Sequence, residues 1–198
     1  MNLEEVRKVY DGWAPFYNPT HSWSLPKRRV ARLLLDVQPN DRVLDLACGT
    51  GANLLHLRKL VGEKGRVIGV DISSRMLDIA KQMIANHDWK NVEVLEADAA
   101  HLPFADRFFD KIICSYALNI IPDYVRTIEE VNRVLTPGGR FVSLEVRSGH
   151  SMPKWLAPIC AVDLSRETVP AIKAVFQNVQ IQSYWSGMIF TSVATKSL

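Results

Sequence analysis

The chain has 198 residues, of which 47% are hydrophobic and 23% are charged, and its 24 Lys and Arg residues exceed its 21 Asp and Glu residues only slightly. This length predicts one sizeable hydrophobic core rather than two domains. The mild net charge of +3 argues against a nucleic-acid-binding protein, which would concentrate basic residues on one face.

Cysteine usage and the start of the chain indicate the compartment. Cys48, Cys114 and Cys160 are far apart and form no CxxC pair, so we expect free thiols and neither a disulfide framework nor a metal site. Residues 1–6 show no sign of a secretory signal, and no apolar run approaches the ~20 residues of a transmembrane helix. We expect a cytoplasmic protein that can also touch a membrane surface.

The first 25 residues predict a short helix followed by an aromatic flap. Apolar residues recur at helical spacing over residues 2–10, and residues 10–23 then hold five aromatic side chains. Because proline lacks an N–H group, we expect Pro15 and Pro19 to prevent one continuous helix. The flap would pack on the domain, cover a ligand as a lid, or do both.

Pro26 begins the next predicted helix, which continues to Val37. The apolar residues expected to face the core are Val30, Leu33, Leu34 and Val37, and the basic residues expected to face solvent are Lys27, Arg28, Arg29 and Arg32. A basic helix face of this kind could also contact a membrane surface.

Strands and helices alternate through the rest of the chain. The predicted strands span 42–47, 66–71, 91–97, 108–115 and 140–146, and the helices between them begin near Asn53, Ser73 or Ser74, and Pro122. We expect Ser165 to cap a last helix. This alternation predicts a parallel sheet between two helix layers.

The C-terminal part differs, because two strand-like runs, 179–185 and 188–195, are joined at Ser186-Gly187. Such a short connection predicts a β-hairpin and therefore at least one antiparallel strand. The expected fold class is α/β: a Rossmann-like three-layer sandwich whose seven-stranded sheet is mostly parallel and ends in an antiparallel hairpin. One domain spans 1–198, with the flap in 1–25, a cofactor-binding core in 26–146 and the helix and hairpin in 147–198.

Residues 43–52 predict a buried strand, a turn of small residues and the start of a helix. Gly49 and Gly51 permit backbone angles and close approaches that a Cβ atom would prevent. Free N–H groups at a helix N-terminus can hold a nucleotide-like ligand or a carboxylate. Asp71 follows Gly51 by 20 residues, about the offset of the acidic residue in dinucleotide-binding folds.

Five stretches in this order resemble class I S-adenosylmethionine (SAM)-dependent methyltransferases, specifically the group of ubiquinone and menaquinone C-methyltransferases. They are YDGWAPFY at 10–17, VLDLACGTG at 43–51, VDIS at 70–73 with Met76-Leu77 behind it, EADA at 96–99 with LPF at 102–104, and VLTPGG at 134–139. The resemblance covers residues 6–146, and the predicted hairpin fits the family's reversed last strand. Ala47 departs from the glycine that the family more often has there.

The resemblance implies SAM as the cofactor, S-adenosylhomocysteine as the product, and a set of contact residues. Those implied for the methionine portion are Asp45, Ala47, Cys48, Gly49 and Gly51. Asp71 would accept hydrogen bonds from both ribose hydroxyls. The residues implied around the adenine are Ile72, Met76, Asp98 and Ala99, with Ser115 at the methyl end.

Methyl transfer from a sulfonium is an in-line displacement, so positioning and desolvation contribute much of the rate. We expect Tyr10 and Tyr17 of the flap to act near the sulfonium, where an aromatic face attracts a cation by ~0.5–2 kcal/mol. The residues expected around the acceptor are Tyr116, Asn119, His21 and Trp155. The alternative for the tyrosines is core packing, and for His21 it is a surface position.

The sequence also limits the classes of molecule that can be the methyl acceptor. Residues 114–118 lack the Asn/Asp-Pro-Pro-aromatic motif of enzymes that methylate amino groups of DNA and RNA, which argues against a nucleic-acid substrate. An aromatic, mildly basic opening suits an amphiphilic acceptor, either a quinone precursor or a phospholipid headgroup. The sequence does not choose between these two, and it does not predict the oligomeric state.

Two other functions stay open. A glycine turn with Asp71 also fits a nicotinamide-dependent oxidoreductase, although Ala47-x-Gly49-x-Gly51 is not GxGxxG and a reversed terminal strand is unexpected there. The other alternative is a non-catalytic module that binds SAM or a partner.

Overall fold

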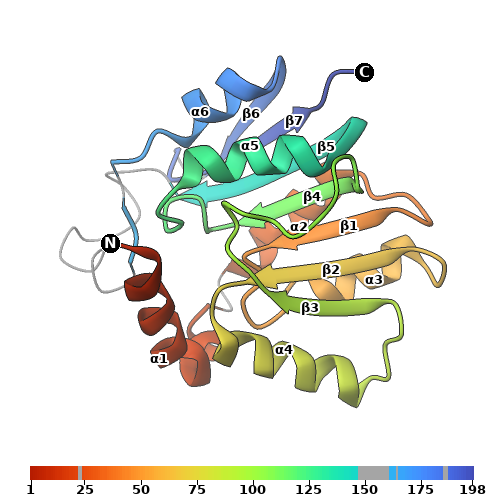
Figure 1. The fold of residues 1–198 in the computed structure, drawn as a ribbon, viewed down its shortest axis with the longest axis vertical. Helices are drawn as coiled ribbons and strands as arrows, with labels where there is room; N and C mark the ends of the chain where they lie inside the picture. The colour runs from red at the N-terminus through yellow and green to blue at the C-terminus, as the bar shows by residue number, and fades with distance from the viewer. Residues whose placement is uncertain (22–23, 147–160, 164, 185–186) are drawn as a thin grey trace.

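The computed structural model describes residues 1–21, 24–146, 161–163, 165–184 and 187–198. In this part of the chain, seven strands form one sheet with helices on both faces (Figure 1). The helices are α1 (Leu3–His21), α2 (Leu25–Leu35), α3 (Leu54–Val61), α4 (Ser74–Asn86), α5 (Tyr124–Val134) and α6 (Thr168–Val175). The strands are β1 (Arg42–Leu46), β2 (Arg66–Asp71), β3 (Val92–Glu96), β4 (Phe109–Ser115), β5 (Leu135–Val146), β6 (Asn178–Tyr184) and β7 (Ile189–Thr195).

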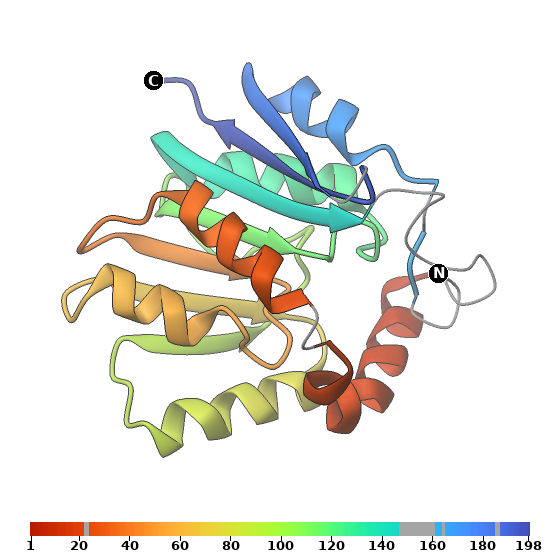
Figure 2. The ribbon, with the colours of Figure 1, turned by 180° about the vertical axis from the view of Figure 1, so that it is seen from behind.

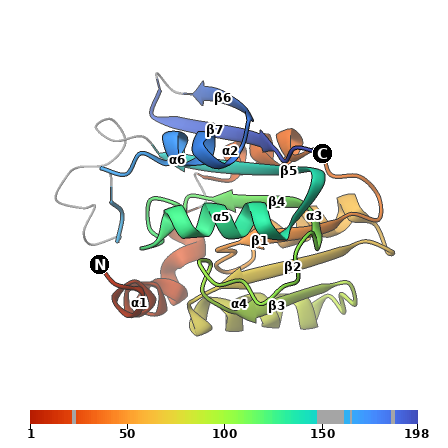
Figure 3. The same cartoon turned by 45° about the horizontal axis from the view of Figure 1, so that its top comes forward.

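The order of strands in the sheet is β3-β2-β1-β4-β5-β7-β6. Strands β1 to β5 pair in parallel, whereas β7 pairs antiparallel with both β5 and β6. Figure 3 shows β3 at one edge of the sheet and β6 at the other. The predicted fold class and the reversed strand of the hairpin are thus confirmed. The chain changes direction across the sheet between β1 and β4, and such a switch point is where open α/β sheets bind ligands.

Alternation along β1 divides the core between the two faces of the sheet. Val43 packs with the buried residues of α2 and α3, and Leu44 packs with those of α5 and α6. Figure 2 shows α2 and α3 crossing the first of these faces. Because β1 is buried on both faces, its sequence after the partly exposed Arg42 is apolar except at Asp45.

Helix α1 corrects the prediction of a short helix and an irregular flap. It runs as one helix of 19 residues through Pro15 and Pro19, and its axis bends before its end (Figure 2). A proline removes one intrahelical hydrogen bond and bends the axis, but contacts with the rest of the domain can outweigh that cost.

Polar contacts along its length attach α1 to the domain. Arg7 pairs with Glu96 at 2.8 Å. The Ser73 hydroxyl donates to Asp11 Oδ1 at 2.6 Å, and the Thr50 hydroxyl donates to Asn18 Oδ1 at 2.5 Å. These contacts span the helix from its second turn almost to its end, so α1 lies against the ends of β3, α4 and the glycine turn.

Helix α2 corrects the predicted buried face. Its buried residues are Arg28, Ala31, Arg32 and Leu35, whereas Leu33 is 70% exposed. The helix ends at Leu35, because Asp36 adopts a left-handed conformation with φ 55°. Two arginines that were expected in solvent therefore point into the domain.

The C-terminal elements differ from the prediction in detail. Residues 185–186, at the predicted tight connection of the hairpin, lie outside the described residues. Ser165 does not cap α6; the N-cap residue is Glu167, and the backbone N–H of Ser165 donates to Asp163 Oδ1 at 3.0 Å. Strand β5 begins at Leu135, five residues earlier than expected. In the described part of the chain, every helix is too short or too polar to cross a membrane.

Candidate functional site

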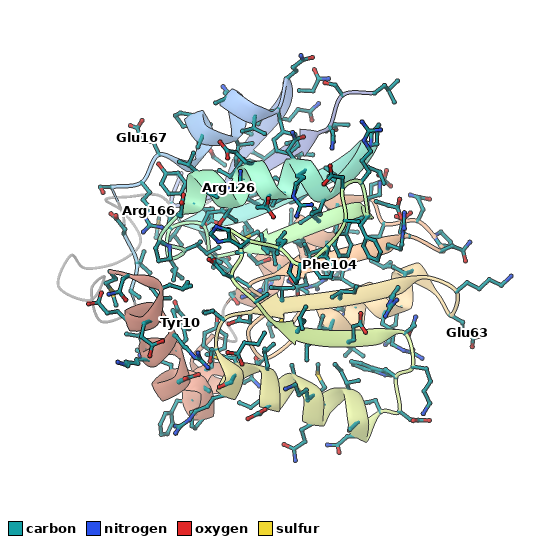
Figure 4. The ribbon with its side chains drawn as sticks, viewed as in Figure 1. Tyr10, Glu63, Phe104, Arg126, Arg166 and Glu167 are labelled. Atoms are coloured by element: carbon teal, nitrogen blue, oxygen red, sulfur yellow. The ribbon has the colours of Figure 1, made fainter. Side chains whose placement is uncertain are left out.

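A cavity lies at the side of the sheet formed by the C-terminal ends of the parallel strands β1, β2, β3 and β4. Its wall comes from the residues that follow each of these strands and from α1, which contributes Leu3, Val6, Tyr10 and Tyr17. The arrowheads of the parallel strands point to this edge in Figure 1. Figure 4 shows Tyr10 there and Glu63 at the opposite edge.

Eight of the predicted cofactor residues line this cavity: Ala47, Gly49, Asp71, Ile72, Met76, Asp98, Ala99 and Ser115. Both predicted catalytic tyrosines, Tyr10 and Tyr17, line it too, as does Tyr116. Among the residues predicted for the site, Asp45, Cys48, Gly51 and Asn119 are absent from the wall. Trp155 and the side chain of His21 lie outside the described residues. The roles assigned to all of these residues stay predictions.

Asp71 joins the glycine turn to the start of α4. Its Oδ2 accepts from the backbone N–H of Gly49 at 2.8 Å, and its Oδ1 accepts from that of Ser73 at 2.9 Å. Burial raises the pKa of Asp71, and the surrounding N–H groups lower it. Because the carboxylate faces the cavity between β1 and β2, it is available to hydroxyl donors there.

Asp98 follows β3, on the other side of the cavity. Its Oδ1 accepts from the backbone N–H of Ala100 at 2.9 Å, and its Oδ2 lies 2.9 Å from His101 Nδ1. The next part of this loop is held by Glu130 of α5, whose Oε2 accepts from the backbone N–H of Leu102 at 2.9 Å.

The turn after β1 contains three left-handed residues: Ala47 at φ 54°, Gly49 at φ 56° and Gly51 at φ 87°. A Cβ atom on Gly51 would lie 2.8 Å from the flexible end of the Met83 side chain, which can move, so the left-handed conformation is the stronger reason for glycine here. Ala47 adopts the left-handed conformation with a Cβ atom, at a cost of about 1 kcal/mol. The departure from the family's glycine is therefore tolerated, but it stores strain in the cavity wall.

Asp45 supports this turn from behind. It is 1% exposed, its Oδ1 accepts from Asn53 Nδ2 at 3.0 Å, and Asn53 Oδ1 in turn accepts from Arg32 Nη1 at 3.0 Å. Burial raises the pKa of Asp45 to about 6. Its second oxygen, Oδ2, has no hydrogen-bond partner among the described residues, so a buried acceptor remains beside the turn.

Arg28 is a site residue that the sequence analysis missed. It is 5% exposed, donates from Nε to Ser24 Oγ at 3.2 Å, and hydrogen-bonds the Tyr17 side chain. Its guanidinium carbon lies 5.3 Å from the centre of the Tyr116 ring, a cation–π distance. The spacing of Arg28, Ala31, Arg32 and Leu35 at i, i+3, i+4 and i+7 was a signal that could have indicated this face.

The tyrosines form a connected aromatic side of the cavity. The rings of Tyr10 and Tyr17 meet edge to face with their centres 6.4 Å apart. Burial raises the pKa of both Tyr17 and Tyr116 above the ordinary value. Both hydroxyls are therefore protonated at neutral pH, where they can donate hydrogen bonds and their rings can face a cation, but they are poor bases.

Two of the predicted site residues, which do not line the cavity, make contacts within the fold. Cys48 has a buried thiol whose pKa is raised by burial, and its backbone N–H donates to the carbonyl of Val70 at 2.9 Å. Asn119 donates from Nδ2 to the carbonyl of Val146 at 2.9 Å. Within the described residues, no group of three His, Cys, Asp or Glu side chains could hold a metal ion.

A seven-stranded sheet with a reversed seventh strand and a cavity at the switch point defines the class I methyltransferase architecture. A family model described as "Methyltransferase domain" matches residues 38–189, and the chain belongs to this family. The resemblance to SAM-dependent methyltransferases is thereby confirmed, with SAM as the cofactor. The match replaces the alternative of a nicotinamide-dependent oxidoreductase.

Curated relatives include a demethylmenaquinone methyltransferase of Bacillus cereus, which is 39% identical over 118 residues. That alignment covers 60% of this chain and 50% of the relative, so the chain matches only about half the length of such relatives.

Two solved structures show the same fold. One belongs to the complex between the Haloferax volcanii Trm112 methyltransferase activator and a methyltransferase, with a TM-score of 0.81, 23% identity, and coverage of 96% of this chain and 98% of that one. The other is phosphoethanolamine N-methyltransferase 2 of Haemonchus contortus in complex with SAM, with a TM-score of 0.74, 16% identity, and coverage of 84% and 51%.

Proposed function

We propose that this protein transfers a methyl group from SAM to a small amphiphilic acceptor, with a reduced quinone precursor as the first candidate. The observation that carries the proposal is the composition of the cavity. Its wall presents the carboxylates of Asp71 and Asp98 and the glycine turn together with tyrosines and apolar side chains. A polar nucleoside and an apolar acceptor would thus meet in one space.

The residues present fit SAM. The methionine ammonium would be near the buried carboxylate of Asp45, whose Oδ2 lacks a partner among the described residues, and near the glycine turn. Asp71 would hold the ribose hydroxyls, because a carboxylate binds two O–H donors more strongly than a neutral group does. Ile72 and Met76 would pack on the adenine, and Asp98 would accept from its amino group.

Apolar residues favour an acceptor with a hydrocarbon ring system. The cavity wall includes the apolar residues Leu3, Val6, Ile120, Ile121 and Pro122. The name of the Bacillus cereus relative supports a quinone precursor. The name of the Haemonchus contortus enzyme supports the second candidate, a phosphoethanolamine headgroup. An amphiphilic acceptor would also fit a protein that works at the membrane surface.

When bound, SAM supplies an electrophilic methyl group, which moves to the nucleophilic atom of the acceptor while the electron pair of the broken C–S bond remains on sulfur. The protein aligns the acceptor with the methyl group and keeps water out of the cavity. Helix α1 covers the cavity and excludes water, and Tyr10 and Tyr17 would turn aromatic faces or O–H groups to the reacting region. The Arg28 cation behind Tyr17 would stabilise the deprotonated, phenolate form of a phenolic acceptor before it attacks.

The first test is cofactor binding. In Asp71→Asn, one amide oxygen can still accept an N–H group, but the charge that would bind the ribose is lost. We expect SAM binding to weaken by about 10- to 100-fold in isothermal titration calorimetry, since a hydrogen bond to a charged group contributes ~1.5–3 kcal/mol. Glu63→Gln, at the opposite edge of the sheet (Figure 4), is the matched control and should bind SAM normally.

The second test is transfer of labelled methyl from SAM to demethylmenaquinol and, separately, to phosphoethanolamine. Transfer to the first supports the proposal, and transfer to the second alone replaces the quinone precursor by the headgroup. SAM binding without transfer to either, or to an extract of lipids and soluble metabolites, would favour the non-catalytic module. A chain that binds no SAM would contradict the proposal as a whole.

A further inference from the structure

The loop after β4, residues 116–122, forms the acceptor side of the cavity. We call it the β4 loop. Five of its residues line the cavity: Tyr116, Ala117, Ile120, Ile121 and Pro122. The shape of this wall therefore depends on how firmly one short loop is held.

The β4 loop is strained and turns tightly. Tyr116 adopts a left-handed conformation with φ 62°, which is costly for a large side chain. The N–H groups of Ile120 and Ile121 both donate to the carbonyl of Ala117, at 2.8 and 2.9 Å. Strain of this kind persists only where the surroundings hold the loop.

The segment before α6 binds the carbonyl groups of the loop. Arg166 donates to the carbonyls of Leu118 and Ile121, and the carbonyl of Asn119 accepts from the backbone N–H of Asp163 at 2.8 Å. Figure 4 shows Arg166 near the start of α5. The carbonyl groups of the loop are thus bound from the segment that precedes α6.

Glu145 of β5 lies next to the N–H groups of Ala117, Leu118 and Asn119 in this loop. This side chain is fully buried, and its Oε1 accepts from the backbone N–H of Leu118 at 3.2 Å. The N–H groups of Ala117 and Asn119 also lie close enough to lower the pKa of the carboxyl. Burial outweighs them and raises that pKa to about 8.

Glu145 holds the loop without a counter-ion. Among the described residues it forms no ion pair within 4 Å, and its Oε2 has no hydrogen-bond partner. Arg28 acts on it only through its charge at longer range. Burying a carboxyl in this way is a poor route to stability, and an apolar residue of similar volume is often as good or better. We therefore expect the buried carboxyl group to have a function other than stability, one that an apolar side chain could not perform.

We propose that Glu145 is a positioning residue for the methyl acceptor: its carboxyl group binds the N–H groups at the start of the β4 loop and thereby fixes the wall that Tyr116, Ala117 and Ile120 present to the acceptor. The cofactor half of the cavity does not depend on it. This inference rests on the proposed function only for the identity of the ligand at that wall.

The experiment compares Glu145→Gln, which keeps an acceptor oxygen, with Glu145→Leu, which keeps the volume and loses the acceptor. For the Leu variant we expect the KM for the acceptor to rise by on the order of tenfold, because a displaced β4 loop would align the acceptor less well in the cavity. The Kd for SAM should stay within about twofold. Gln should restore the acceptor KM to near the wild-type value. An unchanged acceptor KM in the Leu variant, or a Kd for SAM that weakens as much as the KM, would overturn the proposal.

Hydrogen exchange gives a readout that does not need an acceptor. The Leu variant should lose protection at the amides of Ala117, Leu118 and Asn119, while the amide of Leu102 in the loop after β3 keeps its protection. If the wild type turned over no acceptor, the proposed function would fail, and this measurement would still decide the role of Glu145. Equal protection of the β4 loop in the Leu variant and the wild type would contradict that role.

Discussion

Two buried glutamates hold the two loops that form opposite sides of the cavity. Glu130 binds the N–H of Leu102 in the loop after β3, and Glu145 binds the N–H of Leu118 in the β4 loop. The first also pairs with Arg133 at 2.8 Å and with Arg126 at 3.1 Å, whereas the second forms no ion pair among the described residues. The same local task is thus performed by a neutralised carboxylate at the loop after β3 and by an isolated carboxyl at the β4 loop.

The two glutamates differ in the charges around them, and this difference sets their ionisation. Hydrogen bonds from Arg133 lower the pKa of Glu130 and keep it ionised, while burial raises the pKa of Glu145 to about 8 and keeps it largely protonated at neutral pH. Glu130 belongs to a network that also ties Arg133 to the carbonyls of Leu102 and Phe104. We therefore expect Glu130 to matter for folding and Glu145 to matter for the acceptor.

The largest effect on stability should come from breaking the network on the cofactor side. Arg133→Met leaves the buried carboxylate of Glu130 with Arg126 alone, so the free energy of unfolding should fall by about 3 kcal/mol in urea denaturation. Arg126→Met is the matched control: Arg126 is 45% exposed, and its loss should cost less than 1 kcal/mol. Equal losses in the two variants would show that Arg133 does not dominate the network.

The two glutamates should respond to pH in opposite directions. The folded-state pKa of Glu145 lies above its unfolded value, so its favourable contribution is present below about pH 4.5 and is lost as the pH rises towards 8. Glu145→Gln should therefore become more stable relative to the wild type between pH 5 and pH 8, by roughly 2 kcal/mol or more. Urea denaturation at both pH values measures the difference.

Glu130 has a lowered pKa, so its contribution is present above pH 4.5 and is lost as the pH falls further. Glu130→Gln should consequently be destabilised relative to the wild type at pH 7 and approach it under acidic conditions. Parallel pH dependences for the two variants would remove the electrostatic distinction between the two sides of the cavity.

The smallest effect concerns strain, which both halves of the cavity contain. Ala47 on the cofactor side and Tyr116 on the acceptor side are both left-handed. Ala47→Gly should stabilise the fold by about 1 kcal/mol, because glycine adopts this conformation without a Cβ penalty. Thermal unfolding measures the gain, and SAM affinity should change little. A loss of stability would mean that the Ala47 side chain packs better than its conformation suggests.

The sequence predicted most of the fold because local signals agreed with the topology. Strand β2 and helix α4 appear at their expected residues, with the Ser73 hydroxyl accepting from the N–H of Met76 as an N-cap. The resemblance also predicted which residues would gather in the cavity, and eight of the cofactor residues do line it. Their chemical roles still await the binding experiments.

The failures have physical causes that periodicity cannot detect. Pro15 was expected to break α1, but contacts with Glu96, Ser73 and Thr50 hold the helix together across it. Arg28 and Arg32 were assigned to solvent because charged residues usually lie there. The interior they enter is polar, since Asp45 and Asn53 lie beneath the glycine turn, and only tertiary structure reveals that.

Three polar contacts of α1, made by Arg7, Asp11 and Asn18, also affect the order in which the parts of the cavity assemble during folding. Their partners, Thr50, Ser73 and Glu96, lie 32, 62 and 89 positions further along the chain. Helix α1 precedes all three partners in the sequence, yet it cannot dock until β1, β2 and β3 have assembled around them. The helix that covers the pocket therefore comes before its partners in the chain but docks after them.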